Sequence, residues 1–140
     1  MKKSILVVCI IALFSSCNGT KNTAQKVAKG EIPSGKYEIR SINGAAVYKL
    51  FFEVDASEKR IFGKTNCNNF SGDFTNSDNS IKIGPLVTTK MYCEEHVMKV
   101  ESSLFKAFGD ATRYVFDNNM FTLSSEEGVV LRAYRLVSDK

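Results

Sequence analysis

The sequence predicts a mainly β fold of the α+β class: a small curled antiparallel sheet, or barrel-like meander, of about eight strands with one α-helix. Three observations lead to this prediction. Short stretches of alternating apolar and polar residues recur along the chain, and turn-forming residues separate them. A single stretch changes to the period of a helix. Strands and helices do not alternate as they would in a parallel sheet.

Five alternating stretches precede the helical one. They are residues 36–41, 47–54, 59–64, 69–75 and 80–83. Asn43-Gly44 predicts a tight turn after the first stretch, and Gly84-Pro85 ends the fifth. In the third stretch the pattern allows either Ile61 or Phe62 to face the core. Gly72, inside the fourth, indicates a bulge or a close backbone approach, which we expect to lie under the helix.

Residues 94–108 have the period of an amphipathic helix. The apolar stripe consists of Val97, Val100, Leu104, Phe105 and Phe108. We expect this stripe to pack against the sheet and not to hold a ligand. Glu94 and Glu95 suit the positive N-terminal end of a helix, and Gly109 is well placed to end it. The pattern does not decide whether Glu101 pairs with a loop lysine or faces solvent.

Three more strands follow the helix. They are predicted at residues 112–117, 120–124 and 129–136. The connectors Asn118-Asn119 and 125–128 fit tight hairpin turns. A run of short antiparallel strands on both sides of one helix is therefore expected to form a single domain.

The N-terminus resembles the signal peptide of a bacterial lipoprotein. Lys2 and Lys3 precede an apolar run from Ile5 to Phe14, whose helical length of about 15 Å is half a bilayer core. Leu13-Phe14-Ser15-Ser16-Cys17 resembles a lipobox, although Phe14 stands where leucine is commoner. We therefore predict a signal peptide over residues 1–16 and acylation of Cys17.

The predicted organisation is a flexible lipid-anchored tether over residues 17–32 and one domain over residues 33–140. This places the domain in the cell envelope, on the periplasmic face of the outer membrane. Five lysines precede the first acidic residue, Glu31, so the domain itself is close to neutral. A neutral domain argues against nucleic-acid binding, which needs a basic face. We expect a monomer.

The four cysteines have different expected roles. Cys9 leaves with the signal peptide and Cys17 carries the lipid. Cys67 and Cys93 then remain in an oxidising compartment, where a disulfide is the simplest outcome. Two alternatives stay open: a metal site that uses Cys93 and His96, and a Cys–His nucleophilic pair. The single histidine of the chain counts against the metal site, and the oxidising compartment counts against the nucleophilic pair, which needs a reduced thiolate. We expect no metal.

Two segments together resemble the META domain, or HslJ-like, family. The first is Gly63-Lys64-Thr65-Asn66-Cys67-Asn68-Asn69-Phe70-Ser71-Gly72-Asp73-Phe74, and the second is Gly84-Pro85-Leu86-Val87-Thr88-Thr89-Lys90-Met91-Tyr92-Cys93. The resemblance covers residues 33–136 and implies a small antiparallel barrel-like fold with one helix. Tyr92 departs from the alanine of many members. Members are often envelope lipoproteins linked to stress or antibiotic tolerance, and the resemblance implies no catalytic activity or cofactor.

We therefore expect a non-catalytic envelope lipoprotein that acts by protein or cell-wall contact, with an envelope protein as a possible partner. The expected binding surface consists of Thr88, Thr89, Lys90 and Met91, in the long loop before the helix, together with Asn68. For Asn68 and Asn69 a structural role at a strand-to-strand bend is the alternative to ligand contact.

Two other functions stay open. One is a small-molecule carrier with a β-barrel cavity lined by aromatic residues (Phe51, Phe62, Phe70, Phe74, Tyr114 and Phe116). The other is an inhibitor of a lysozyme-type hydrolase, which would need a protruding loop within residues 84–92. An enzyme is not expected, because the adjacent carboxylates diverge and one histidine offers little base chemistry.

Overall fold

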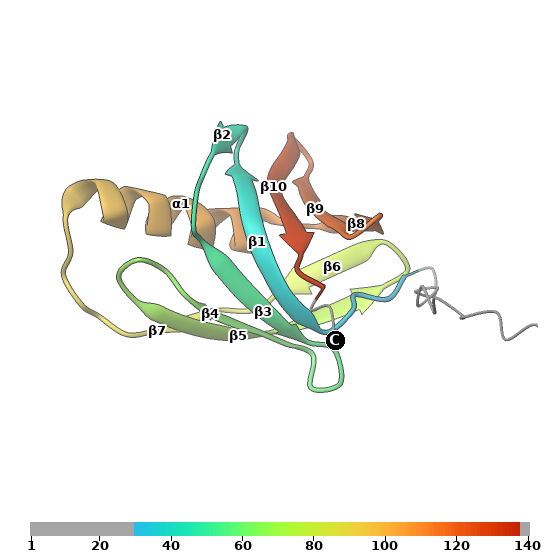
Figure 1. Ribbon diagram of the computed structural model, residues 1–140. Helices are drawn as coiled ribbons and strands as arrows, with labels where there is room; N and C mark the ends of the chain where they lie inside the picture. Colours follow the sequence, from blue (N-terminus) through green and yellow to red (C-terminus); the bar gives the residue numbers. More distant parts are fainter. Residues whose placement is uncertain (1–29, 138–140) are drawn as a thin grey trace, which may run out of the picture.

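The computed structural model describes residues 30–137, which form a closed eight-stranded antiparallel β-barrel with one α-helix (Figure 1). The barrel strands are β1 (Gly35–Ile42), β3 (Phe51–Asp55), β4 (Arg60–Lys64), β5 (Asn69–Ser77), β6 (Ser80–Ile83), β8 (Arg113–Asp117), β9 (Met120–Ser125) and β10 (Gly128–Arg135). The two-residue strands β2 (Ala45–Ala46) and β7 (Val87–Thr88) pair with β1 and β5. Helix α1 spans Glu95–Asp110. The predicted fold class is confirmed.

The barrel closes through β1, which pairs with β3 on one side and with β10 on the other. The weakest part of the wall lies between β6 and β8, where the only residue pair is Ser80 with Arg113. Two of the predicted turns have the left-handed backbone that tight hairpins need. Asn118 and Asn119 have φ angles of 47° and 64°, and Asn43 has 47°.

Aromatic side chains fill the interior of the barrel. Tyr37 stacks on Phe52 with 5.1 Å between ring centroids, and Phe108 of the helix packs edge-on against Phe52 at 5.5 Å. Phe70, Phe74 and Tyr114, three of the residues that could have lined a carrier cavity, are buried in this core. In β4 it is Ile61 that faces the core, and Phe62 lies on the outer face.

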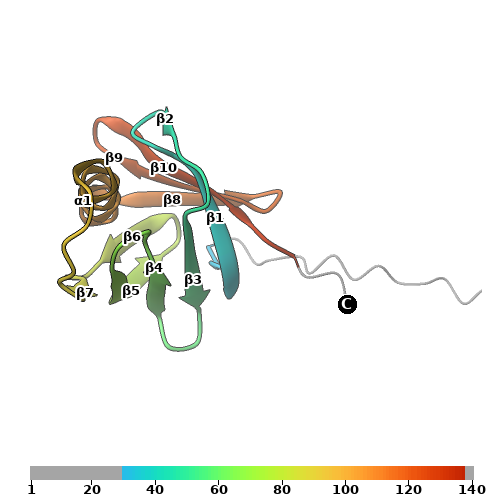
Figure 2. The ribbon, with the colours of Figure 1, turned by 60° about the vertical axis from the view of Figure 1, so that its left-hand side comes forward.

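Helix α1 covers one end of the barrel, where it packs against β1, β6, β9 and β10 (Figure 2). The helical stripe was only partly predicted. The buried residues are Glu101, Leu104, Ala107 and Phe108. Val100 is 37% exposed, because the N-terminal part of the helix is less deeply covered than the C-terminal part. Gly109 does not end the helix, which continues to Asp110 and stops where Ala111 adopts extended backbone.

The domain begins earlier than residue 33. Ile32 belongs to the hydrophobic core, and the Gly30 carbonyl accepts hydrogen bonds from the Tyr114 hydroxyl and from Asn76 Nδ2. Residues 30–32 are therefore part of the barrel and not of the tether. The predicted signal peptide, Cys9, Cys17 and the rest of the tether lie outside the described residues. Within residues 30–137, no helix combines the length and apolar character needed to cross a bilayer.

Candidate functional site: a fixed connector beside an outer groove

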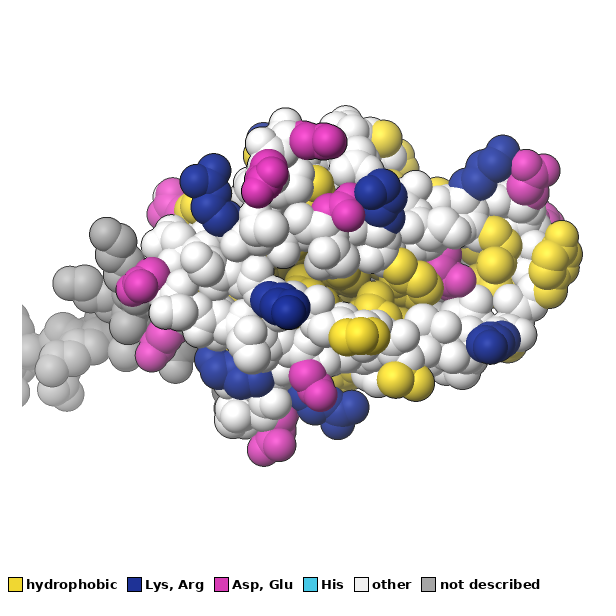
Figure 3. All heavy atoms as spheres, turned by 180° about the vertical axis from the view of Figure 1, so that it is seen from behind, with side chains coloured by type: hydrophobic (Ala, Val, Ile, Leu, Met, Phe, Trp, Pro, Cys, Tyr) yellow, Lys and Arg dark blue, Asp and Glu magenta, His cyan; other side chains and the backbone are white. Residues whose placement is uncertain are grey.

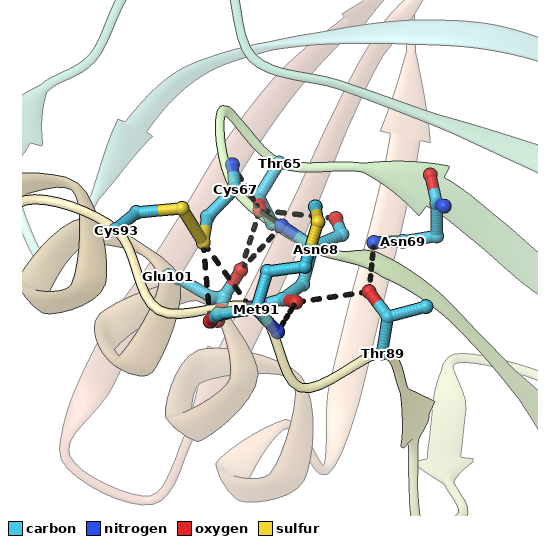
Figure 4. Close-up of a disulfide and its surroundings, with 8 residues drawn as sticks. All are labelled: Thr65, Cys67, Asn68, Asn69, Thr89, Met91, Cys93 and Glu101. Carbon is cyan, nitrogen blue, oxygen red and sulfur yellow. Dashed lines mark hydrogen bonds between the residues drawn. A yellow bond between two sulfur atoms is a disulfide. The ribbon is translucent and has the colours of Figure 1, made fainter.

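Cys67 and Cys93 form a disulfide with 2.05 Å between the sulfur atoms (Figure 4). The bond joins the loop between β4 and β5, which contains Cys67, to Cys93 in the segment immediately before α1. Cys93 therefore offers no thiolate, either to a metal with His96 or as a nucleophile. His96 lies instead 3.3 Å from the exposed carboxylate of Glu94. Among residues 30–137, no three His, Cys, Asp or Glu side chains converge as metal ligands would.

Glu101 is buried, with 5% of its surface exposed, so it does not face solvent, and it pairs with no lysine within residues 30–137. Its Oε2 accepts hydrogen bonds from the Thr65 hydroxyl at 2.5 Å and from the Asn68 backbone N–H at 3.1 Å. Its Oε1 accepts one from Asn68 Nδ2 at 2.8 Å. The carboxylate thus links the helix to the β4–β5 loop, and these three bonds compensate the cost of burying it.

Asn68 also bonds to the segment between β6 and α1, residues 84–94, which we call the connector. Its Oδ1 accepts hydrogen bonds from the Thr89 hydroxyl at 2.9 Å and from the Met91 N–H at 2.8 Å (Figure 4). Asn68 therefore fills the structural role expected at this bend through its side chain, since its backbone φ is not positive.

The predicted binding residues divide into two groups. Asn68 is buried and accepts a hydrogen bond from the Thr89 hydroxyl, so these two side chains hold the connector in place, although Thr89 itself is exposed. Thr88, Lys90 and Met91 remain accessible. Sequence reasoning missed the two most exposed apolar residues of the connector, Val87 and Tyr92. Tyr92 carried a signal, since the departure from the family pattern placed a tyrosine there.

A groove of about 590 Å³ lies on the outer face of the barrel beside the connector. It is lined by Glu53, Phe62, Gly63, Lys64, Asn69, Phe70, Ser71, Val87, Thr88 and Thr89. A second hollow, of about 440 Å³, shares Glu53, Gly63 and Lys64 with it and extends over β3 towards Lys36. The two hollows therefore adjoin each other on the outside of the wall.

The Gly72 backbone approaches the connector and not the helix. A Cβ atom at Gly72 would lie 2.6 Å from Leu86 Cδ2 and 3.4 Å from the Pro85 carbonyl oxygen. The close approach predicted from the sequence is therefore confirmed, but its partner was assigned wrongly. The absence of a side chain at this position lets the start of the connector lie against β5.

The fold and the two sequence segments define a small disulfide-linked barrel, and the chain belongs to the META domain family, which matches residues 30–138. No curated protein matches the sequence. An NMR structure of a protein from Burkholderia xenovorans is 16% identical, with a TM-score of 0.55 over 75% of this chain and 80% of that one. A second NMR structure is 19% identical, with a TM-score of 0.57 over 72% and 88%. These likenesses show the fold alone.

Proposed function

We propose that this chain is a non-catalytic lipoprotein of the cell envelope, anchored through Cys17, and that it binds a protein partner through the connector. The lipobox-like segment supports the anchor and the periplasmic face of the outer membrane as the location. The family resemblance supports a role in stress or antibiotic tolerance. The exposed apolar side chains of the connector support the binding of a protein partner.

The observation that carries the proposal is a connector that is firmly held and yet apolar on its exposed side. It is fixed at three points: the pairing of Thr88 with Phe70, the Asn68 side chain and the Cys67–Cys93 disulfide. The exposed fractions of its apolar side chains are 73% for Val87, 51% for Met91 and 96% for Tyr92. Tyrosine and methionine are enriched in protein interfaces, and a preorganised loop loses less entropy on binding.

The position of the connector agrees with an anchored molecule. The described chain begins at Gly30, whose carbonyl accepts hydrogen bonds from Asn76 and Tyr114 beside the β5–β6 turn. Figure 1 shows this turn at one end of the barrel and the start of α1, which follows the connector, at the other end. The connector therefore lies at the end of the barrel opposite the point where the anchored N-terminal segment joins it, which leaves it accessible to a partner (Figure 1).

The test places a photo-crosslinking amino acid at position 92 of the full-length protein in living cells. The control carries it at Tyr48, which is also highly exposed but belongs to the β2–β3 connection. We expect one reproducible protein adduct at position 92, absent at 48 and abolished by Met91→Ser in the same chain. Equal adduct patterns at both positions would refute a contact role for the connector. Palmitate labelling that survives Cys17→Ser would refute the anchor.

The inhibitor function remains a second candidate, because an exposed, fixed connector is what it requires. The purified protein can be tested for inhibition of lysozyme, with the Tyr92→Ser variant as the comparison. The carrier function has less support, since aromatic side chains pack the core where a ligand would have to lie. The network around Glu101 is fully bonded within the fold, which favours a structural use of that carboxylate over a catalytic one.

A further inference from the structure

We propose that the outer groove over β4, β5 and β7 binds an acidic saccharide, meaning a sugar that carries a carboxylate on or beside its ring. The groove shares Val87, Thr88 and Thr89 with the connector, but its lining does not include Met91 or Tyr92 at the exposed tip. The inference therefore goes beyond the protein contact proposed above and does not depend on it.

The size of the groove suits a small ligand. Its volume of about 590 Å³ falls in the range of roughly 300–1,000 Å³ that is usual for small-molecule sites. The adjoining hollow continues along the wall past Glu53 and Lys64 towards Lys36. The shared lining residues make one elongated depression, which has room for more than a single sugar ring.

An exposed aromatic ring lies in the middle of the groove. Phe62 is 40% exposed on the outer face of β4, and the strand register places Glu53 and Ser71 directly opposite it on the two neighbouring strands. Val87 lies opposite Ser71 and continues the row. The electron-rich face of a phenyl ring attracts the polarised C–H groups on one face of a sugar ring. Phe62 is therefore the stacking surface.

Polar side chains without partners in the fold surround this ring. Among residues 30–137, the side chains of Asn69, Ser71 and Thr88 make no hydrogen bond to another described residue. Asn69 lies opposite Lys64 in the β4–β5 pairing, next to the row that holds Phe62. Hydroxyl and amide groups around an aromatic ring provide the donors and acceptors that sugar hydroxyls need.

The charge of the depression favours an acidic ligand. Lys64 makes no salt bridge within the described chain, and Lys36 lies with its Nζ 4.6 Å from the centre of the Phe51 ring. Glu53 is the acidic residue among the lining side chains of the two hollows. Two lysines against one glutamate leave an excess of positive charge, which attracts a carboxylate and discriminates against a neutral sugar.

The experiment titrates the isotope-labelled full-length protein in phosphocholine micelles, which contain no sugar, and follows its amide NMR signals. The acidic probe is the disaccharide of N-acetylglucosamine and N-acetylmuramic acid. The neutral probe is chitobiose, which has similar rings and no carboxylate. We expect shifts confined to the residues that line the two hollows, on or next to β1, β3, β4, β5 and β7, and tighter binding of the acidic probe by about threefold, as an exposed ion pair provides. No shifts at millimolar ligand, or equal affinities for the two probes, would overturn the proposal.

Two variants separate the stacking from the charge. Phe62→Thr keeps a strand-forming residue and should lower the affinity for both probes by about fivefold, the loss expected for one stacking contact. Lys64→Gln should weaken the acidic probe alone, to the level of chitobiose. Val115→Thr, at an exposed position of β8 outside the groove, is the matched control and should change neither affinity. Unchanged binding by Phe62→Thr with an intact amide spectrum would refute the site.

The saccharide and the protein contact can fail separately. Tyr92→Ser removes the exposed end of the connector and should leave both saccharide affinities unchanged. Parallel losses in Tyr92→Ser and Phe62→Thr would show that the groove is not a site of its own.

Discussion

The carboxylate of Glu101 binds both the backbone N–H and the side-chain amide of Asn68, although 33 positions separate the two residues in the chain. Asn68 in turn holds Thr89 and Met91. The buried Asn68 side chain therefore links the helix that covers the barrel to the connector that we propose as the contact surface. The fixed shape of the connector depends on this pair as well as on the disulfide.

Replacing Glu101 with glutamine should destabilise the fold. The carboxamide offers an NH₂ group where an acceptor is needed, so at least one of the three donors around Glu101 loses its partner. We expect the free energy of unfolding, measured in urea with the disulfide intact, to fall by about 1–3 kcal/mol. The control is Glu95→Gln, an exposed residue of the same helix paired with Lys99 at 2.7 Å, with a loss of about 0.5 kcal/mol at most. Similar losses in the two variants would contradict the assignment.

Asn68→Asp and Asn69→Asp form a matched pair, because the residues are adjacent and only the first is buried. At position 68 the change replaces the amide that donates to Glu101 with a second carboxylate, so like charges face each other. We expect hydrogen exchange at the Met91 amide to become faster by about tenfold or more, because its acceptor site is disturbed. Asn69→Asp should leave that rate unchanged.

Removal of the disulfide should lower the free energy of unfolding by about 3.5 kcal/mol, the value that the chain-entropy relation gives for its loop. The loop spans a separation of 26 residues. The variant Cys67→Ala/Cys93→Ala should unfold at a lower denaturant concentration than the oxidised protein and should be insensitive to reductant. If reductant shifted the midpoint of this variant as well, the loss could not be attributed to the Cys67–Cys93 bond.

Two glycine-to-alanine substitutions should have opposite effects. A Cβ at Gly63 would lie 2.8 Å from the Phe51 carbonyl oxygen and 2.9 Å from Phe70 Cζ, so overpacking should cost about 1–3 kcal/mol. At Gly109, inside the helix, a Cβ meets no atom within 4 Å. There alanine should stabilise the protein by about 0.5–1 kcal/mol. Thermal unfolding of both variants checks the sign of each change.

Tyr37 should make the fold sensitive to alkaline pH. Its hydroxyl donates a hydrogen bond to the Pro33 carbonyl, and burial raises the pKa of its phenol, only partly offset by the charge of Arg135. Above the ordinary tyrosine pKa of about 10, the unfolded chain releases this proton and the folded chain keeps it, so stability falls by up to about 1.4 kcal/mol per pH unit. Below that pH the contribution is constant.

In the variant Tyr37→Phe, the free energy of unfolding should therefore fall less steeply between pH 9 and pH 11 than in the unmodified protein. Its lost hydrogen bond lowers stability at every pH and does not change the slope. Tyr48→Phe, at an exposed position, should keep the slope of the unmodified protein. A slope that is the same in all three proteins would show that Tyr37 does not titrate as expected.

Local patterns in the sequence predicted the strands, the turns at Asn43 and Asn118, and the presence of the helix, because each depends on residues close together in the chain. The face of the helix was harder to predict. Glu101, Leu104 and Phe108 have helical spacing and share the buried face, but a glutamate is ordinarily exposed and was left out of the stripe. Its burial requires donors from Thr65 and Asn68, which only the folded barrel brings near.

The groove could not be predicted for a similar reason. Phe62, Ser71 and Val87 come from three separate strands, and their alignment depends on the register of two strand pairs. The inward or outward choice at Phe62 was itself undecided in the sequence. The connector was identified as a surface, but the division between its anchoring and its exposed residues depends on hydrogen bonds to Asn68.

The pairing of β1 with β10 has a consequence for how the protein matures. These strands lie near the two ends of the described chain, with Tyr37 opposite Arg135. Loop closure over such a separation is slow, and β10 emerges last from a ribosome or a translocation pore. Until it arrives, β1 and β9 each present an unpaired backbone edge that can join another chain. The protein is therefore most vulnerable to aggregation in the interval before its final strand docks.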